Sequence, residues 1–268
     1  MKAFSFEKPD SVEAAVAALG TEDTLALAGG MTLIPTLKQR LAECAAVVDL
    51  SGVAEMTGIS LEGETLVIGA MTRHAEVAGS DVVKKAIPAL AKLASRIGDQ
   101  QVRHRGTIGG SVANNDPAAD YPSAVLALGA EIVTSKRTIP ADDFFLGMFE
   151  TALEPGEIIV RFRFPIPDMA GYAKFASPAS RYALAGVFVA RTGEAVRAVV
   201  TGVGPCVFRP ADVENALSRE FAPHALDRIS IDSTDFMSDI HADKDYRAHL
   251  AVVMAKRAVK AALEEGGS

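Results

Sequence analysis

A run of small residues, RHRGTIGGSVANNDPAAD (residues 103–120), constrains the fold of this chain more than any other segment. It combines two adjacent glycines, several small polar side chains and a late carboxylate, with almost no large residue among them. Because 49% of the chain is hydrophobic, the sequence does not lack residues that could fill a core at these positions. Small residues are expected where a backbone must come close to another backbone or to a ligand. A flexible surface loop is the alternative interpretation of the same run.

A second pair of adjacent glycines lies nearer the N-terminus, in LAGGMTLIP (residues 27–35). It follows an apolar strand pattern and precedes an amphipathic helix pattern, as an anion-binding turn does. Glycines let backbone N–H groups approach an oxyanion, and a following helix adds the positive end of its dipole. A Gly-Gly pair at the end of a strand more often forms an ordinary turn without a ligand. This pair alone therefore leaves open whether the segment is a plain turn or a phosphate-binding turn. Two such segments in one chain favour a long cofactor, such as a dinucleotide.

The common nucleotide-binding motifs do not occur in the sequence. GVGPCV (residues 202–207) comes nearest to a dinucleotide fingerprint, but it lacks the third glycine of G-x-G-x-x-G. It also has a proline where the helix should begin. No Walker A sequence occurs either. We therefore predict neither a Rossmann site nor a P-loop.

The hydrophobic pattern predicts mixed helices and strands up to a boundary near residues 167–171, and an antiparallel sheet with helices after it. No internal repeat is visible. Strands are expected over residues 24–30, 45–50, 65–72 and 156–167, within 122–135, within 171–191 and over 195–205. Helices are expected over residues 11–19, 33–43, 87–97, 211–217 and 246–264, from residue 74, and at the start of 122–135.

The net charge, the apolar runs and the cysteines of the chain argue against several classes of protein. The formal net charge is −7, whereas a surface for nucleic acid or anionic lipid needs an excess of Lys and Arg. The N-terminus lacks an apolar signal-peptide core, and no apolar run approaches the roughly 20 residues that span a bilayer. Cys44 and Cys206 lie far apart without a partner motif, which suits a reducing compartment. We expect a soluble cytoplasmic protein with no nucleic-acid partner and no membrane span.

Few side chains suggest catalysis or metal binding. His74 and His104 lie near the glycine segments, but no histidine pair has ligand spacing, so solvated or capping roles are predicted for them. Two cysteines cannot supply the four thiolates of an iron–sulfur cluster. The carboxylates of DPAAD (residues 116–120) permit acid–base work, but the proline between them favours a structural and ribose-binding role. No catalytic residue and no metal ligand is predicted.

Two apolar segments have an ambiguous role. FRFPIP (residues 162–167) and DDFFLGMF (residues 142–149) are apolar enough for the core or for a subunit interface. The sequence alone does not separate these alternatives.

Several motifs together resemble one family, the FAD-binding medium subunit of the molybdenum hydroxylases. That family includes bacterial carbon monoxide dehydrogenase and xanthine dehydrogenase-like enzymes. The resemblance covers nearly the whole chain, its motifs occur in family order, and the third is the most specific. The motifs that carry it are AGGMTLIP, IGAMTRHAEV, GTIGGSVANNDPAADYPSAVLALGA and YAKFASPASRYALAGV.

The resemblance implies an α+β fold of the vanillyl-alcohol-oxidase type, also called PCMH-type, in which two α+β subdomains hold an extended FAD. The FAD-binding domain would comprise residues 1–168, with subdomains of about 1–55 and 56–168. Residues 171–268 would form a small C-terminal domain of the carbon monoxide dehydrogenase flavoprotein type, with an antiparallel sheet and helices. This domain would close over the isoalloxazine.

The resemblance also implies which residues bind FAD. In the first segment the family positions match Ala28, Gly29, Gly30, Met31, Thr32 and Leu33. In the second they match Thr107, Ile108, Gly109 and Gly110, with Ser111 and Asn114 continuing the wall of the site. Asp120 matches an acidic residue near the adenosine part, and Lys174 and Tyr182 match positions near the flavin. The family often has His-Ser where this chain has Met31 and Thr32, so backbone amides and a hydroxyl remain but the histidine is absent.

The function implied is that of an electron-transfer subunit. The molybdenum cofactor would lie on a large partner subunit and the 2Fe–2S clusters on a small one, in a complex that is a dimer of heterotrimers. FAD on this chain would pass the electrons to an external acceptor. A self-contained FAD-dependent oxidase or dehydrogenase of the same fold is the alternative, and a binding protein that has lost FAD is a third. Neither the substrate nor the acceptor can be read from the chain.

Overall fold

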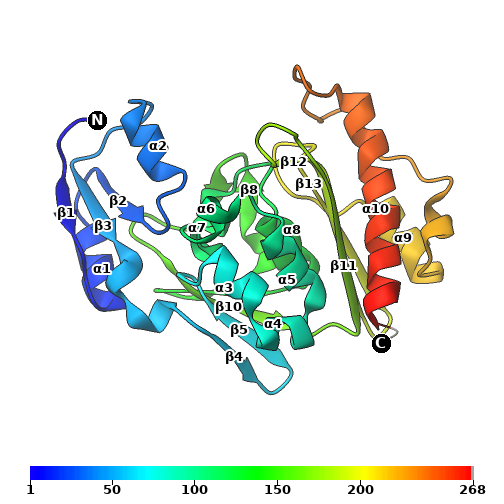
Figure 1. The fold of residues 1–268 in the computed structure, drawn as a ribbon, viewed down its shortest axis with the longest axis horizontal. Helices are drawn as coiled ribbons and strands as arrows, with labels where there is room; N and C mark the ends of the chain where they lie inside the picture. The colour runs from blue at the N-terminus through cyan, green and yellow to red at the C-terminus, as the bar shows by residue number, and fades with distance from the viewer. Residues whose placement is uncertain (267–268) are drawn as a thin grey trace.

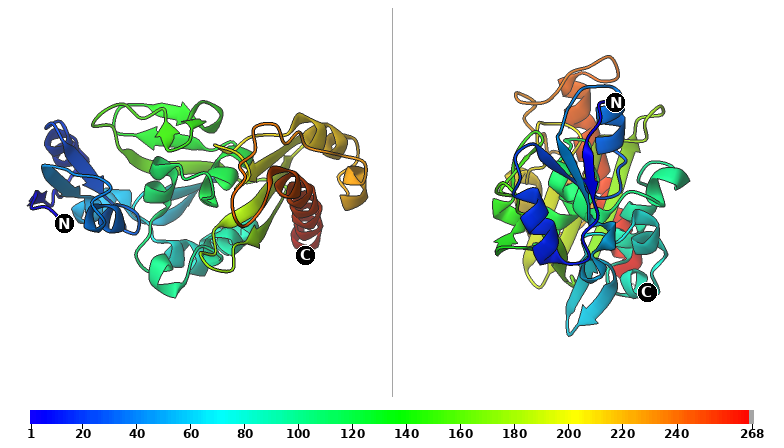
Figure 2. Two further views of the ribbon diagram at one scale, coloured as in Figure 1. Left: turned by 90° about the horizontal axis from the view of Figure 1, so that it is seen from above. Right: turned by 90° about the vertical axis from the view of Figure 1, so that its left-hand side faces the viewer.

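The structure, a computed structural model, describes residues 1–266. Three parts follow one another along the long axis of the molecule, and each contains its own principal sheet (Figure 1). The N-terminal part, in blue, lies at one end, and the C-terminal part, in yellow to red, lies at the other. The left view in Figure 2 shows the same order from above, and the right view shows the N-terminal part in front of the other two.

The first sheet is parallel, with strand order β1-β3-β2. Its strands and the helices that connect them are β1 (Ser5–Glu7), α1 (Val12–Leu19), β2 (Thr24–Leu27), α2 (Leu33–Lys38) and β3 (Ala46–Asp49). The unit β2, Gly-Gly, α2, β3 is the one that the sequence predicts, while β1 was not expected. The helix predicted over residues 33–43 is too long, because Arg40 adopts a left-handed backbone conformation (φ 60°) that an α-helix does not allow.

The second sheet has five strands in the order β4-β5-β10-β6-β7, all antiparallel to their neighbours. The strands are β4 (Ile59–Glu62), β5 (Thr65–Gly69), β6 (Glu131–Thr134), β7 (Thr138–Pro140) and β10 (Ile159–Pro165). The central strand carries Phe162 and Phe164, which are both fully buried. The FRFPIP segment therefore contributes its two phenylalanines to the core.

Six helices surround this sheet: α3 (His74–Gly79), α4 (Asp81–Ala86), α5 (Pro88–Ser95), α6 (Gln100–Arg103), α7 (Ile108–Asn114) and α8 (Tyr121–Ala127). The glycine-rich run 103–120 is thus not a loop, since α7 occupies its middle. Thr107 caps this helix by accepting a hydrogen bond from the Gly110 amide, and Asn115 ends it in a left-handed conformation (φ 43°).

A small hairpin, β8 (Phe145–Gly147) and β9 (Glu150–Thr151), projects beside α7. Phe144, just before it, is fully buried, whereas Leu146, Met148 and Phe149 are 59%, 48% and 58% exposed. The DDFFLGMF segment therefore contributes one ring to the core and leaves its tip exposed. An interface role for that tip stays a prediction.

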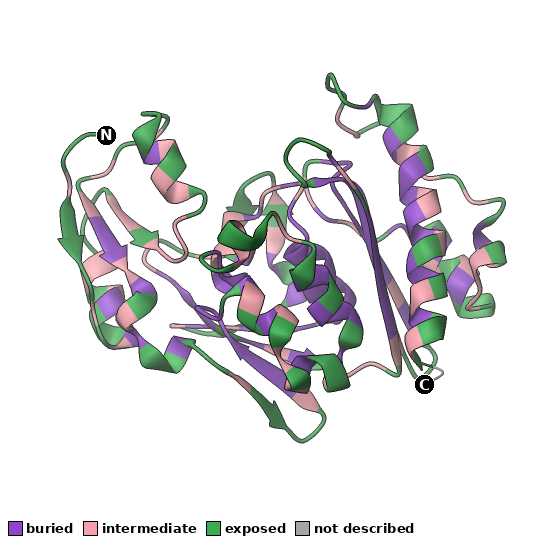
Figure 3. Cartoon of the chain, in the orientation of Figure 1, coloured by how far each residue is buried: buried purple, intermediate pink, exposed green. Residues whose placement is uncertain are grey.

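The third part is an antiparallel sheet, β11-β12-β13, covered on one side by a long helix. Its elements are β11 (Met169–Ala176), β12 (Ala183–Thr192), β13 (Ala195–Thr201), α9 (Ala211–Arg219) and α10 (Lys244–Gly266). Gly171 lets α10 lie directly on the sheet, because a Cβ there would be 2.0 Å from the carbonyl oxygen of Ala258. The buried residues of α10 form a stripe, whereas its other faces are exposed (Figure 3). Residues 1–266 also contain the short 3₁₀ turns η1 (Leu50–Gly52), η2 (Ala54–Met56), η3 (Ala141–Asp143) and η4 (Pro223–Leu226).

Hydrogen bonds to backbone carbonyls join the third part to the DPAAD segment. The Thr201 hydroxyl lies within hydrogen-bond distance of the carbonyl oxygens of Pro117 (3.1 Å) and Ala119 (2.8 Å) and donates its one hydrogen between them, and the Gly202 amide also donates to Pro117 (2.9 Å). Gly202 has a φ of 87°, which favours glycine. GVGPCV is therefore not a nucleotide motif, and its first residue, Gly202, takes part in this contact between the two parts. The division into domains at residues 168 and 171 remains our prediction.

No helix within residues 1–266 combines the length and apolar character needed to cross a membrane.

Candidate cofactor-binding site

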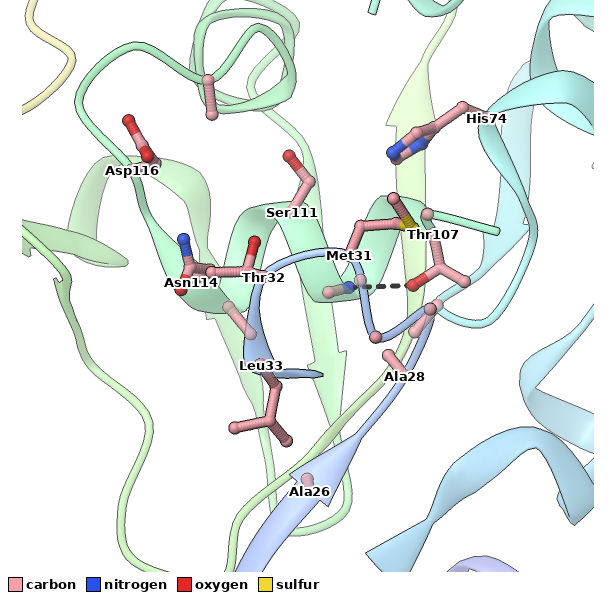
Figure 4. Close-up of a pocket in the computed structure, with 18 of the residues that line it drawn as sticks. Ala26, Ala28, Met31, Thr32, Leu33, His74, Thr107, Ser111, Asn114 and Asp116 are labelled. Atoms are coloured by element: carbon pink, nitrogen blue, oxygen red, sulfur yellow. Dashed lines mark hydrogen bonds between the residues drawn. The ribbon is translucent and has the colours of Figure 1, made fainter. Parts of the chain in front are cut away.

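A cleft with a volume of about 630 Å³ opens where the three parts meet. Both glycine segments line it, and residues 180–182, in the turn between β11 and β12, lie at one edge. Every residue predicted to bind the cofactor lines this cleft except Ile108, which is in the core, and Lys174, which is buried behind Asp120. Figure 4 shows Thr32 of the first segment beside Asn114 of α7. The structure thus brings together segments that are far apart in the sequence.

The first glycine segment has unused hydrogen-bond donors. Within residues 1–266, no backbone hydrogen bond has an amide of residues 29–33 as its donor. Gly30 is in a left-handed conformation (φ 74°), which turns the chain from β2 toward α2. Successive free N–H groups around such a turn form a concave donor surface that binds anions. This segment can therefore hold a phosphate group.

The second glycine segment differs, because the amides of Ile108 and of both glycines already have partners. The Ile108 amide donates to the Thr72 carbonyl (3.1 Å), and the Gly109 amide donates to the Ala70 carbonyl (2.8 Å). The Gly110 amide donates to the Thr107 hydroxyl oxygen (3.1 Å). Within residues 1–266 the Thr107 amide has no hydrogen-bond partner, so the expectation that amides of both segments face a pyrophosphate has most of its free donors in the first segment and only this one at the start of the second.

The glycines of both segments allow close packing between backbones. A Cβ on Gly109 would lie 2.5 Å from the Cβ of Ala70, and one on Gly110 would lie 3.2 Å from the Cβ of Ala28. A Cβ on Gly29 would lie 2.3 Å from the Arg105 carbonyl oxygen. The two segments therefore pack directly on each other, and the small residues serve this contact.

Asp120 and Lys174 form a buried ion pair at the back of the cleft. The Lys174 ammonium lies 2.9 Å from Asp120 Oδ1 and 3.0 Å from Oδ2, and Tyr172 donates a short hydrogen bond to the same carboxylate. Burial raises the pKa of Asp120, although the Lys174 charge and the Tyr172 hydroxyl act in the opposite direction. Lys174 also donates to the Arg181 carbonyl (3.0 Å), beside Tyr182 at the edge of the cleft. The pair thus fixes the turn that borders the cleft.

Tyr172 was not predicted from the sequence. It precedes Lys174 by two positions on β11, so both side chains lie on the same face of the strand. That spacing, in a strand pattern, could have indicated that the two residues bind one partner. The partner itself could not be read from the pattern.

The predicted role of His104 is confirmed, and that of His74 is wrong. His104 is exposed and its Nδ1 lies 2.7 Å from the Gln100 carbonyl oxygen. His74, in contrast, is buried and lines the cleft. Its burial depends on contacts with residues more than one turn away in sequence, which the local pattern does not reveal.

The carboxylates of DPAAD have structural partners. Asp116 accepts a hydrogen bond from the Ala118 amide (2.8 Å), and Asp120 binds Lys174 and Tyr172. Within residues 1–266, no group of three side chains is placed to bind a metal ion. The rest of the cleft wall is largely apolar and includes Leu25, Leu50, Met56, Met71, Val102 and Ile159.

A cleft with free amides and an apolar wall, bordered by a turn of the C-terminal sheet, is typical of an α+β protein that binds a phosphate-containing cofactor. Comparison with known proteins identifies its family. Residues 2–167 match the family model described as the FAD binding domain in molybdopterin dehydrogenase. The chain therefore belongs to the family of FAD-binding medium subunits of the molybdopterin hydroxylases. Proteins of this family are subunits of oxidoreductase complexes.

Individual relatives match nearly the whole chain. The carbon monoxide dehydrogenase medium chain of Hydrogenophaga pseudoflava is 36% identical, with 97% of this chain and 96% of the relative covered. The nicotine 6-hydroxylase medium subunit of Paenarthrobacter nicotinovorans is 34% identical, with 97% of each covered.

Solved structures confirm the predicted α+β fold with its C-terminal antiparallel sheet and helices. A chain of the carbon monoxide dehydrogenase of Hydrogenophaga pseudoflava superposes with a TM-score of 0.88 at 36% identity, with 98% of each chain covered. A chain of quinoline 2-oxidoreductase from Pseudomonas putida 86 gives a TM-score of 0.86 at 30% identity, with 99% of this chain and 100% of that chain covered.

Proposed function

We propose that this chain is the FAD-binding electron-transfer subunit of a heteromeric molybdenum hydroxylase. It would take electrons from iron–sulfur clusters and pass them to an external acceptor. The observation that carries the proposal is the cleft at the two glycine segments, with its free amides at residues 29–33. Bound FAD would supply a group that accepts electrons singly and delivers them singly or in pairs.

The residues of the cleft fit such a cofactor. The volume of about 630 Å³ lies within the usual range of cofactor and ligand sites. The amides of residues 29–33 offer neutral donors to an anionic pyrophosphate, and the apolar wall suits aromatic rings. Ser111 and Asn114 line the cleft beside these amides. We assign the pyrophosphate to the first segment and the support of that segment to the second.

The predicted contacts at the two ends of the cofactor remain part of the proposal. Asp120 would lie near the adenosine, and its Oδ2, which within residues 1–266 has only Lys174 as a partner, can accept a further hydrogen bond. Tyr182, which is partly exposed at the edge of the cleft, would lie near the flavin. Lys174 would act there by holding the Arg181 carbonyl.

The partners are proposed from what this chain lacks and from the relatives' names. Cys44 and Cys206 are both free, and two thiols cannot hold an iron–sulfur cluster. The relatives in Hydrogenophaga pseudoflava and Paenarthrobacter nicotinovorans are called a medium chain and a medium subunit. We propose a large partner with the molybdenum cofactor and a small partner with 2Fe–2S clusters, in a dimer of heterotrimers. The acceptor and the substrate would be set by the complex.

Two experiments test the proposal. The purified chain should release FAD, and not FMN, when it is denatured, and the apoprotein should bind added FAD. Anaerobic mixing of the single chain with candidate substrates should leave the flavin absorption band unchanged. Bleaching at a catalytic rate without partners would show that the chain is a self-contained oxidase, and release of FMN would contradict the cofactor assignment.

A further inference from the structure

His74 brings an unpaired polar group to the cofactor cleft. It is the first residue of α3, is 4% exposed and lines the cleft. Within residues 1–266 neither of its ring nitrogens has a hydrogen-bond partner, and Nδ1 is completely buried. Native structures leave few buried polar atoms unpaired, so each one calls for a partner or an explanation. Figure 4 shows the ring reaching from α3 toward Met31 and Thr107.

The ring is held in a fixed position. A Cβ on Gly106 would lie 2.5 Å from His74 Nε2, so glycine at this position makes room for the imidazole. The His74 amide donates to the Gly106 carbonyl (3.0 Å), which ties the two backbones together. On another side the ring contacts Tyr121, with 5.3 Å between the ring centroids. Of the two ring nitrogens only Nδ1 is completely buried, so Nε2 is the nitrogen that can reach the cleft.

The charge state of this imidazole follows from its surroundings. Burial, and then the positive charge of Arg103 on α6, lower the pKa of His74 to about 4. Tyr121 on α8 is the other titratable group in contact, and burial raises its pKa, so its hydroxyl stays neutral. At neutral pH His74 is therefore uncharged, with one nitrogen as donor and the other as acceptor.

We infer that His74 is a positioning residue of the cofactor site and that its Nε2 forms a hydrogen bond with bound FAD. The inference rests on the proposed function. It gives Nε2 a partner that the protein does not supply, while Nδ1 stays buried behind it. It also gives Gly106 a role, because a side chain there would displace the ring from the cleft wall.

Three substitutions at one position test the inference. His74→Gln places an amide near the position of Nε2, His74→Asn places one near Nδ1, and His74→Leu removes both polar atoms. The dissociation constant of FAD is measured by fluorescence titration of each apoprotein, with thermal unfolding of the apoprotein as the control for folding. We expect Leu and Asn to weaken binding roughly tenfold, which is the effect of one hydrogen bond, and Gln to stay within about threefold of the original protein. His104→Gln, on the exposed end of α6, is the matched control and should leave the affinity unchanged.

The outcomes separate this inference from the proposed function. Unchanged FAD affinity in His74→Leu, or equal weakening in the Gln and Leu variants, overturns the hydrogen bond while leaving FAD binding in place. Failure of the unsubstituted apoprotein to bind FAD overturns both. If the variants do not fold, the ¹⁵N signals of His74 in the original protein decide: FAD should shift Nε2, and an unshifted signal overturns the inference.

Discussion

The two glycine segments look alike in the sequence but differ in what their backbones do. In the first, the amides of residues 29–33 have no protein partner, and Gly30 turns the chain in a left-handed conformation. In the second, the amides of Ile108, Gly109 and Gly110 are all engaged within the protein. One segment is thus open to a ligand, and the other is a packing surface on which the first one lies. A Gly-Gly pair shows that backbones or ligands come close, but only the hydrogen bonds show which.

The comparison predicts that changes around the second segment act on folding, and that changes in the first act on cofactor binding. The largest effect is expected at Lys174, which neutralises Asp120 at the end of the second segment. Lys174→Met leaves a buried carboxylate without its charge partner, and we expect a loss of about 3–5 kcal/mol in the free energy of unfolding. Urea unfolding of the apoprotein measures it. The double variant with Asp120→Asn should recover much of the loss, and a loss below about 1 kcal/mol would contradict the structural role.

The next effect is a dependence of stability on pH that originates at His74, which packs on Gly106 beside the second segment. Its pKa is lowered to about 4 in the folded protein, from 6.5 in an unperturbed histidine. Below pH 6.5 the unfolded chain therefore binds a proton that the folded protein does not. The free energy of unfolding should fall by about 3 kcal/mol between pH 6.5 and pH 4 from this residue alone.

The contribution of His74 is isolated by comparing the protein with His74→Gln, because the other titrating groups are shared. If the free energies of unfolding of the two proteins change in parallel between pH 4 and pH 6.5, the pKa of His74 is the same in the folded and the unfolded protein, and this prediction is wrong.

Gly109→Ala should cost about 1–3 kcal/mol of apoprotein stability, because its methyl group would collide with Ala70. Gly79→Ala is the control, since it is also a helical glycine but has no atom within 4 Å of the added methyl group. That control should be neutral or slightly stabilising. Thermal unfolding of both apoproteins, at equal protein concentration and without FAD, measures the difference. Equal stabilities would break the distinction between the two segments.

The smallest effect is expected in the first segment. Thr32 is exposed and its hydroxyl caps no helix, so Thr32→Ala should leave apoprotein stability within about 0.5 kcal/mol. If the hydroxyl contacts the cofactor, the dissociation constant of FAD should rise about three- to tenfold. Fluorescence titration checks this value. A destabilised apoprotein with normal FAD affinity would reverse the roles that we assign to the two segments.

Local patterns in the sequence predicted most of the elements, including α5, α10 and the strands β11, β12 and β13. They failed where distant residues decide the local conformation. Residues 108–114 contain two glycines and an asparagine, which favour a loop, yet the carbonyls of Thr72 and Ala70 fix the first turn of α7.

The site shows the same limit. The residues that line the cleft were largely identified through the family resemblance, because their motifs are local. The pairing of Asp120 with Lys174 joins residues 54 positions apart, and the burial of His74 depends on Gly106 and Tyr121. No short window of the sequence contains these contacts. They could not be predicted from side-chain type or spacing alone.

The hydrogen-bonded contact between Thr201 and the DPAAD carbonyls has a consequence for the order of folding. Thr201 is 84 positions from Pro117 and 82 from Ala119, so this contact forms only after a long loop of chain has closed. Contacts of this separation slow folding, whereas the helices α3 and α4 pack mainly on helices nearby in sequence. We expect the N-terminal parts to collapse first, with the cleft still open on the side of β12 and β13. Competence to bind the cofactor should then appear in the slowest refolding phase, together with the C-terminal sheet.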